Sequence, residues 1–141
     1  MRAVLDTNVL ISGLLWKGAP HHCLLAAEGG LYALVSAEPV LFELRQKLIE
    51  KFRNTPEEAD GTLAGLRGIA VLVTLTGRTG WVIADPDDDK VIDAALVGSA
   101  DIIVSGDHHL LKLGTVEGIA VLSPRQFLDR LLHDSSIELA D

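Results

Sequence analysis

The chain has 141 residues, 48% hydrophobic and 23% charged, with a net charge of −8; this composition fits one globular domain and excludes a mostly disordered chain. No run approaches the roughly 18–20 apolar residues that a membrane-spanning helix needs, and Asp6 interrupts the N-terminus before a signal stretch could form. The single cysteine, Cys23, allows no intrachain disulfide, so a reduced protein of the cytoplasm is the simplest interpretation.

The first half of the chain alternates between apolar segments and residues that cap or break helices. Thr7 or Asn8 is expected to cap the helix after the first strand, and Pro20 to open the next helix. Ser36 is the expected N-cap of a long amphipathic helix, and Thr55, followed by proline and two acids, starts another. The predicted strands lie at 2–5 and 31–35, and the predicted helices at 9–16, 20–28, 37–53 and 56–68.

The second half continues this alternation. A continuous apolar run at 69–75 predicts a buried strand, and 81–83 is a candidate for a short edge strand. An Asp-rich loop at 85–88 leads into the next helix, and residues 133–141 are expected to form a disordered acidic tail after a single domain of residues 1–132. Further strands are predicted at 101–104 and 119–122, and helices at 89–98, 108–113 and 124–132.

The order of these elements indicates an α/β fold. Alternating strands and helices, with strands that are apolar on both faces, favour a three-layer α/β/α sandwich around a central, mainly parallel sheet. In such sheets the chemistry lies at the carboxyl ends of the strands. Asp6 directly follows the first strand and Asp107 follows the strand at 101–104, so both acids are expected at that edge.

Three further acids are candidates for the same edge. Asp89 lies in the first turn of its helix, and Asp93, four residues later, shares its face. Glu43 lies in the first third of the long helix and is expected to point to the same end of the sheet. With Asp6 and Asp107, four or five carboxylates are therefore expected to converge at this edge. Residues 85–93 alone carry a charge of −4.

Such a group of carboxylates predicts a metal site. Converged carboxylates repel one another and are costly to desolvate unless a cation lies between them, and Mg²⁺ or Mn²⁺ prefers oxygen ligands. One or two ions fit this pattern; two, roughly 3.5–4 Å apart, would activate a water and stabilise the leaving oxygen of a phosphodiester. Each acid taken singly is explained equally well as a helix cap or an exposed side chain. Only the joint placement of the acids predicts metal-assisted phosphodiester hydrolysis.

The same residues resemble the signatures of PIN-domain nucleases. Asp6-Thr7-Asn8 is similar to the opening motif of that family. Asp89-x-x-Ile92, followed by Ser105-x-Asp107, is similar to its second motif, and Glu43 matches its remaining acid. The resemblance extends over residues 1–132.

This resemblance implies a PIN-like fold and a Mg²⁺-dependent ribonuclease similar to VapC-type toxins. Such proteins cut RNA, are often homodimers and are held inactive by a cognate antitoxin. Asp93 departs from the family pattern, which often has a small apolar residue there, and is either a fifth metal ligand or a carboxylate behind the ligands. By the resemblance, the acidic quartet would be Asp6, Glu43, Asp89 and Asp107, with Asn8 and Ser105 as supporting polar residues.

Other functions are also consistent with parts of the pattern. A phosphatase of the haloacid-dehalogenase type is disfavoured, because Asn8 stands where that family needs a second aspartate. A non-catalytic module that holds a cation and acts through a protein partner stays open. The basic residues of the long helix, Arg45, Lys47, Lys51 and Arg53, either form a solvated face or contact an RNA backbone. Trp16 and Trp81 are the large aromatic candidates for base stacking, and each is alternatively part of the core.

Overall fold

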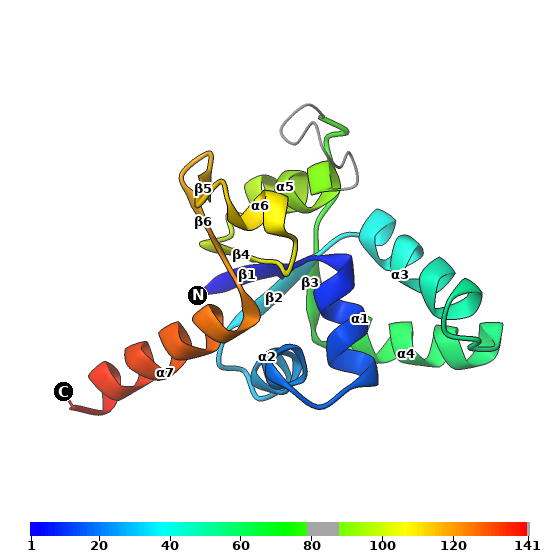
Figure 1. Cartoon of the computed structure of the whole chain (residues 1–141), viewed down its shortest axis with the longest axis horizontal. Helices are drawn as coiled ribbons and strands as arrows, with labels where there is room; N and C mark the ends of the chain where they lie inside the picture. Colours follow the sequence, from blue (N-terminus) through cyan, green and yellow to red (C-terminus); the bar gives the residue numbers. More distant parts are fainter. Residues whose placement is uncertain (79–87, 141) are drawn as a thin grey trace.

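The computed structural model describes residues 1–78 and 88–140 of the chain, and within them helices cover both faces of one six-stranded sheet (Figure 1). The strand order is β3-β2-β1-β4-β6-β5. The strands are β1 (Arg2–Leu5), β2 (Ala33–Ser36), β3 (Ala70–Leu72), β4 (Ile102–Val104), β5 (Thr115–Val116) and β6 (Ile119–Leu122). The helices are α1 (Thr7–Leu15), α2 (Ala19–Glu28), α3 (Glu38–Glu50), α4 (Pro56–Ile69), α5 (Asp88–Val97), α6 (His108–Leu111) and α7 (Pro124–Ala140).

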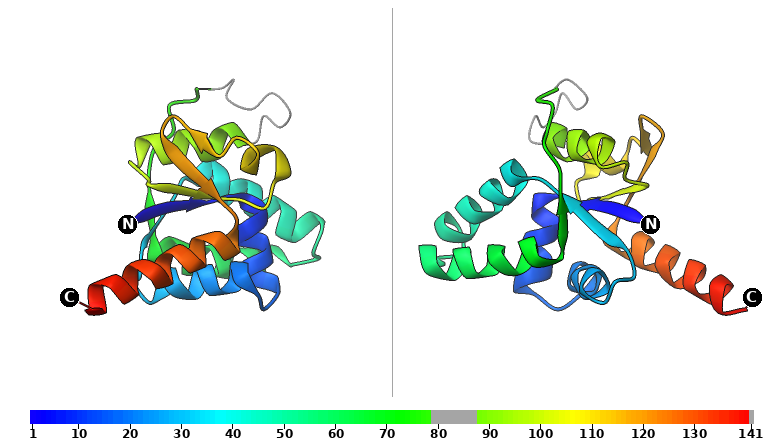
Figure 2. Two further views of the ribbon diagram at one scale, coloured as in Figure 1. Left: turned by 60° about the vertical axis from the view of Figure 1, so that its left-hand side comes forward. Right: turned by 180° about the vertical axis from the view of Figure 1, so that it is seen from behind.

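The sheet confirms the predicted α/β/α architecture. Five strands run parallel, and only the short β5 is antiparallel to its neighbour β6. Successive residues of β1 face opposite sides: Val4 belongs to the core beneath α5, and Leu5 to the core shared with α1–α4 and α7. Figure 2 shows these two helical layers on either side of the sheet. Because both faces are covered, the central strands are mostly apolar, with Arg2 at the start of β1 and Ser36 at the end of β2 as the polar exceptions.

Several local predictions are confirmed. Pro20 lies in the first turn of α2, which ends at Glu28 as predicted, with Gly29 as its C-cap. Helix α4 begins with a capping box, in which the Thr55 hydroxyl accepts a hydrogen bond from the Glu58 amide and the Glu58 carboxylate accepts one from the Thr55 amide. No helix in the described part of the chain has the length and apolarity needed to span a membrane.

Two predicted helix caps are wrong. The N-cap of α1 is Asp6, whose carboxylate accepts the Val9 N–H, and not Thr7 or Asn8. The N-cap of α3 is Ala37, because Ser36 still pairs with Leu72 in the ladder between β2 and β3. In both cases the parallel sheet decides where the strand ends, and the cap follows from it.

Strand β3 is also not the buried strand that its apolar sequence predicted. It lies at the edge of the sheet with one neighbour, and its residues Val71 and Leu72 are each 39% exposed. Helix α4 continues as far as Ile69, which leaves only three residues for the strand. The predicted edge strand at 81–83 and most of the Asp-rich loop lie outside the described residues.

The C-terminal helix is longer than predicted. The sequence placed its end near Leu132, followed by a disordered tail at 133–141, whereas the backbone of α7 is helical as far as Ala140. Residues 133–140 contain no glycine or proline, so nothing in them stops a helix that has already begun. The short strand β5 pairs antiparallel with β6, which follows it after two residues. This strand was not predicted.

Candidate active site

The centre of the site joins the ends of β1 and β4. Asp6 is 4% exposed, and its backbone N–H donates to the Val104 carbonyl. One oxygen of its carboxylate accepts the Val9 N–H at 2.7 Å, and the other accepts the hydroxyl of the fully buried Ser105. The same Ser105 Oγ accepts the backbone N–H of Asp107 at 2.9 Å. A single serine therefore fixes the two acids relative to each other.

Electrostatics at this centre favour a nearby cation. Burial is the main cause that raises the pKa of Asp6 above its ordinary value, and the charge of Asp107 raises it further. The hydrogen bonds from Ser105 and Val9, and the charge of Lys47, lower the pKa but do not offset the burial. The ionised form of this carboxylate is therefore poorly stabilised by its protein surroundings, and a bound cation would favour it.

Glu43 is joined to this centre through lysines. Its carboxylate forms ion pairs with Lys47 Nζ at 3.1 Å and with Lys90 Nζ at 3.4 Å. Lys47 Nζ also lies 3.5 Å from the Asn8 side-chain oxygen on α1. The Glu43 side chain is 16% exposed, so two ammonium groups provide positive charge beside an acid whose side chain is largely shielded from water.

Asp89 and Asp93 share the predicted face of α5. Asp93 is 2% exposed, and its carboxylate accepts hydrogen bonds from the Thr76 amide, the Thr76 hydroxyl and the Gly77 amide at 2.8–2.9 Å. Asp89 is 4% exposed and lines, together with Asp93, a hollow of about 410 Å³ between α5 and the segment that follows β3. These bonds tie the segment beyond the edge strand to the sandwich.

The structure thus brings some of the predicted residues together and leaves others apart. Asp6, Ser105 and Asp107 form one hydrogen-bonded group, and Lys47 connects Glu43 and Asn8 to it. Among the described residues, no three His, Cys, Asp or Glu side chains are arranged to hold one metal ion. The ion pairs of Glu43 with Lys47 and Lys90, and the hydrogen-bond partners of Asp93, were not predicted from the sequence, although Lys47 stands four residues after Glu43, the spacing of a helical ion pair.

The donor chemistry fits a hard divalent cation. Asp6, Asp107 and Glu43 offer carboxylate oxygens, and Mg²⁺ is commonly held by one or two carboxylates with its other positions filled by water and phosphate. Ser36 Oγ, buried at the end of the neighbouring strand β2, has no hydrogen-bond partner within the part of the chain that the structure describes and is a further polar atom at this edge. Histidine and cysteine, the ligands of softer metals, are not part of this group.

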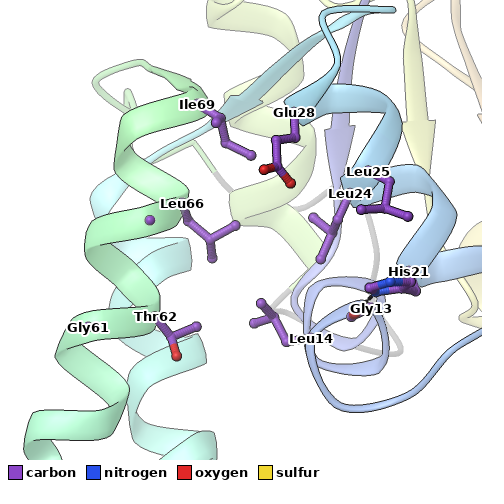
Figure 3. A pocket seen from close by; sticks show the side chains of 11 residues that line it. Gly13, Leu14, His21, Leu24, Leu25, Glu28, Gly61, Thr62, Leu66 and Ile69 are labelled. Carbon is purple, nitrogen blue, oxygen red and sulfur yellow. Dashed lines mark hydrogen bonds between the residues drawn. The ribbon is translucent and has the colours of Figure 1, made fainter.

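Two hollows flank the first helices. One, of about 330 Å³, is lined by Asn8, Ser12 and Asp107 and so lies beside the acidic centre. The other, of about 410 Å³, lies away from the acids between α2 and α4 (Figure 3). In it Leu24 and Leu66 face each other, and Gly61 leaves the surface of α4 open.

Comparison with known proteins decides the family. The family model of the PIN domain matches residues 2–109, which include every acid of the predicted site. The chain belongs to the PIN domain family. The fold of this PIN domain is also that of a chain in the crystal structure of VapBC2 from Rickettsia felis bound to a DNA fragment from their promoter. The TM-score is 0.62 at 14% identity, and the match covers 86% of this chain and 97% of that one. No curated protein sequence matches this PIN domain.

Proposed function

We propose that this PIN domain is a metal-dependent endoribonuclease that hydrolyses phosphodiester bonds of RNA in the cytoplasm. The observation that carries the proposal is the pair formed by the buried Asp6 and the half-buried Asp107, held at the strand ends by Ser105. Family membership supports it, because the matched region contains these residues.

In this proposal Asp6, Asp107, Glu43 and Asp89 hold Mg²⁺ or Mn²⁺. When bound, the ion supplies an activated water and charge stabilisation for the leaving oxygen. Ser105 keeps Asp6 in place and orients the backbone that carries Asp107. Asn8 and Glu43 both contact Lys47, whose ammonium group lowers the repulsion among the acids before metal binds.

Asp93 has a different role in this scheme. Its oxygens accept three hydrogen bonds from Thr76 and Gly77, so we assign it to holding this segment beside Asp89 and not to the metal. Asp88, the first residue of α5, is adjacent to Asp89 in an acidic run. Separate substitutions of Asp88 and Asp89 will show which of the two neighbouring acids the reaction needs.

The test is cleavage of a mixed pool of tRNA and ribosomal RNA with EDTA, Mg²⁺ or Mn²⁺. We expect cleavage only with metal, and its loss in Asp6→Asn, Asp107→Asn and Glu43→Gln. Asp129→Asn, at an exposed position of α7, is the matched control and should cut like the wild type. Cleavage in EDTA, or unchanged cleavage by Asp6→Asn, would refute the assignment.

A non-catalytic role is the second candidate. Two observations favour it: no three metal-ligating side chains come together among the described residues, and the Glu43 carboxylate already forms ion pairs with Lys47 and Lys90. In that case a cation would stabilise the fold while the domain acts through a protein partner. Stabilisation by Mg²⁺ in thermal unfolding, with no turnover of any RNA in the pool, would support it.

We further propose that the domain is the toxin of a toxin–antitoxin pair. The structural similarity to a chain of the VapBC2 complex supports this proposal, as does the apolar hollow of Figure 3, which would accept an apolar segment of an antitoxin. A Cβ at Gly65 would meet no atom within 4 Å, so Gly65→Trp should fold and fill the hollow. Co-purification with the product of the adjacent gene should be lost in Gly65→Trp and kept in the wild type.

The oligomeric state completes the proposal. By the family resemblance we expect a homodimer, and light scattering of the purified chain will measure its mass. A monomer at micromolar concentration would contradict that expectation but would not bear on the proposed metal-dependent cleavage of RNA.

A further inference from the structure

Trp16 is a large aromatic side chain that the proposed chemistry does not use. It stands at the C-terminal end of α1 and is 58% exposed. The ring contacts Phe52 edge to face, with the ring centroids 5.9 Å apart and the planes at 78°. This contact links the ends of α1 and α3 and orients the indole, while more than half of the side chain stays open to solvent.

Cationic residues stand next to these two aromatic residues in the sequence. Lys17 follows Trp16, and Lys51 and Arg53 stand on either side of Phe52; all three are exposed. Lys51 continues the row that Glu43 and Lys47 begin on α3, because residues four apart share one helical face. Arg45, in contrast, pairs with Asp60 on α4 at 2.7 Å and is directed elsewhere.

This row connects the acidic centre with the aromatic pair. Helices α1 and α3 start at the carboxyl ends of the neighbouring parallel strands β1 and β2, and Asp6 lies at the start of α1 (Figure 1). Trp16 lies ten residues beyond Asp6, so the distance along the axis of α1 is roughly 15 Å, a span that a few nucleotides of an extended strand can cover. An aromatic surface flanked by cations is suited to a base and its neighbouring phosphates, since every base has a face that can stack.

We propose that Trp16 is the stacking surface for an unpaired base of the RNA, with Lys17 and Lys51 binding the adjacent phosphates. The strand then runs between α1 and α3 from the Asp6–Asp107 centre to the Trp16–Phe52 pair. This inference rests on the proposed ribonuclease function and adds the residue that holds an unpaired base, in a single strand or in a loop, at a distance from the cut. It also predicts a preference for an intact base at one fixed distance from the cut.

The test uses equilibrium binding of fluorescein-labelled single-stranded RNA in EDTA, so that no cleavage occurs. Trp16→Ala should weaken binding about 5- to 150-fold, the range that stacking on an aromatic residue provides, and Trp16→Phe should weaken it less. Phe42→Ala is the matched control, because Phe42 is an equally exposed aromatic residue of α3 at 62%. Lys51→Ala should reduce the salt dependence of binding.

Two readouts separate stacking from a general loss of structure. In a Trp81→Phe background the fluorescence of Trp16 alone should be quenched by RNA. A single abasic nucleotide moved along the RNA should weaken binding to the wild type at one position, and the same RNA should bind Trp16→Ala no more weakly than intact RNA. The proposal is overturned if Trp16→Ala binds RNA like the wild type, or if it loses affinity equally for intact and abasic RNA.

These outcomes are distinct from failure of the proposed function. If the wild type binds RNA through Trp16 but never cuts it, the stacking proposal stands and the proposed nuclease function is refuted. If the wild type cuts RNA with metal and Trp16→Ala binds RNA as tightly as the wild type, the nuclease function stands and the stacking proposal is refuted. Antitoxin binding that is lost in Trp16→Ala, with RNA binding intact, would assign the ring to a protein partner and overturn the proposal.

Discussion

Replacing Asp93 separates its structural role from metal binding. The carboxylate lies on α5 and accepts three hydrogen bonds from Thr76 and Gly77, in the segment after the exposed edge strand β3. Asp93→Ala removes all three acceptors at once. Asp93→Asn keeps the shape, because its amide oxygen can accept the two backbone N–H groups while its NH₂ group donates to the Thr76 hydroxyl oxygen.

The size of the effect follows from these bonds. A hydrogen bond to a charged group contributes about 1.5–3 kcal/mol, and the donors here are partly exposed, so water replaces part of each lost bond. We therefore expect Asp93→Ala to lower the free energy of unfolding by about 3 kcal/mol, a large share of the 5–15 kcal/mol that is usual for a domain. Asp93→Asn should cost less than about 1 kcal/mol.

Urea unfolding measures the global effect, and hydrogen exchange of the Thr76 and Gly77 amides measures the local one. Both amides should exchange faster in Asp93→Ala than in Asp93→Asn, and Mg²⁺ affinity should be the same in Asp93→Asn and the wild type. Equal stabilities and exchange rates for the two variants would show that the hydrogen bonds do not hold the segment. A loss of Mg²⁺ affinity in Asp93→Asn would instead make Asp93 a metal ligand.

Three further predictions concern other parts of the molecule. Because burial raises the pKa of Asp6, the stability that this residue contributes to the metal-free protein should be lost as the pH rises from 3.8, the ordinary value, through the raised pKa, so the wild type should lose stability relative to Asp6→Asn over this range. Asp6→Asn should not show this loss, as urea unfolding at several pH values will test. Lys47→Met should tighten Mg²⁺ binding roughly 2- to 5-fold in calorimetry, because it removes an ammonium group from Glu43; weaker binding would contradict this. Thr55→Ala should lower the melting temperature through loss of about 1 kcal/mol of capping, and an unchanged melting temperature would count against the capping box.

The sequence predicted the sheet and its carboxyl edge well. Alternating strands and helices, and strands apolar on both faces, determine a parallel sheet in which Asp6 and Asp107 must meet. The extent of β3 could not be predicted, because an apolar run does not show whether a strand has one neighbour or two. The helical cap at Asp6 was likewise decided by strand pairing, which depends on residues far away in the sequence.

The surroundings of the acids were harder to predict than their positions. The hydrogen bonds of Asp93 come from residues 16 and 17 positions earlier, beyond any helical spacing. The ion pair between Lys90 and Glu43 joins two helices, so only their packing brings the charges together. Trp16 could equally have been part of the core, and its exposure depends on where α1 ends relative to α3.

The most direct test of the central claim is the initial rate of RNA cleavage as a function of Mg²⁺ concentration for the wild type and Asp6→Asn. Urea unfolding should first confirm that the variant is at least as stable as the wild type at neutral pH. The account predicts a saturable, EDTA-reversible rate for the wild type and a rate at the EDTA background for the variant. A folded Asp6→Asn protein that cuts RNA at the wild-type rate would contradict the assignment of the buried carboxylates to catalysis.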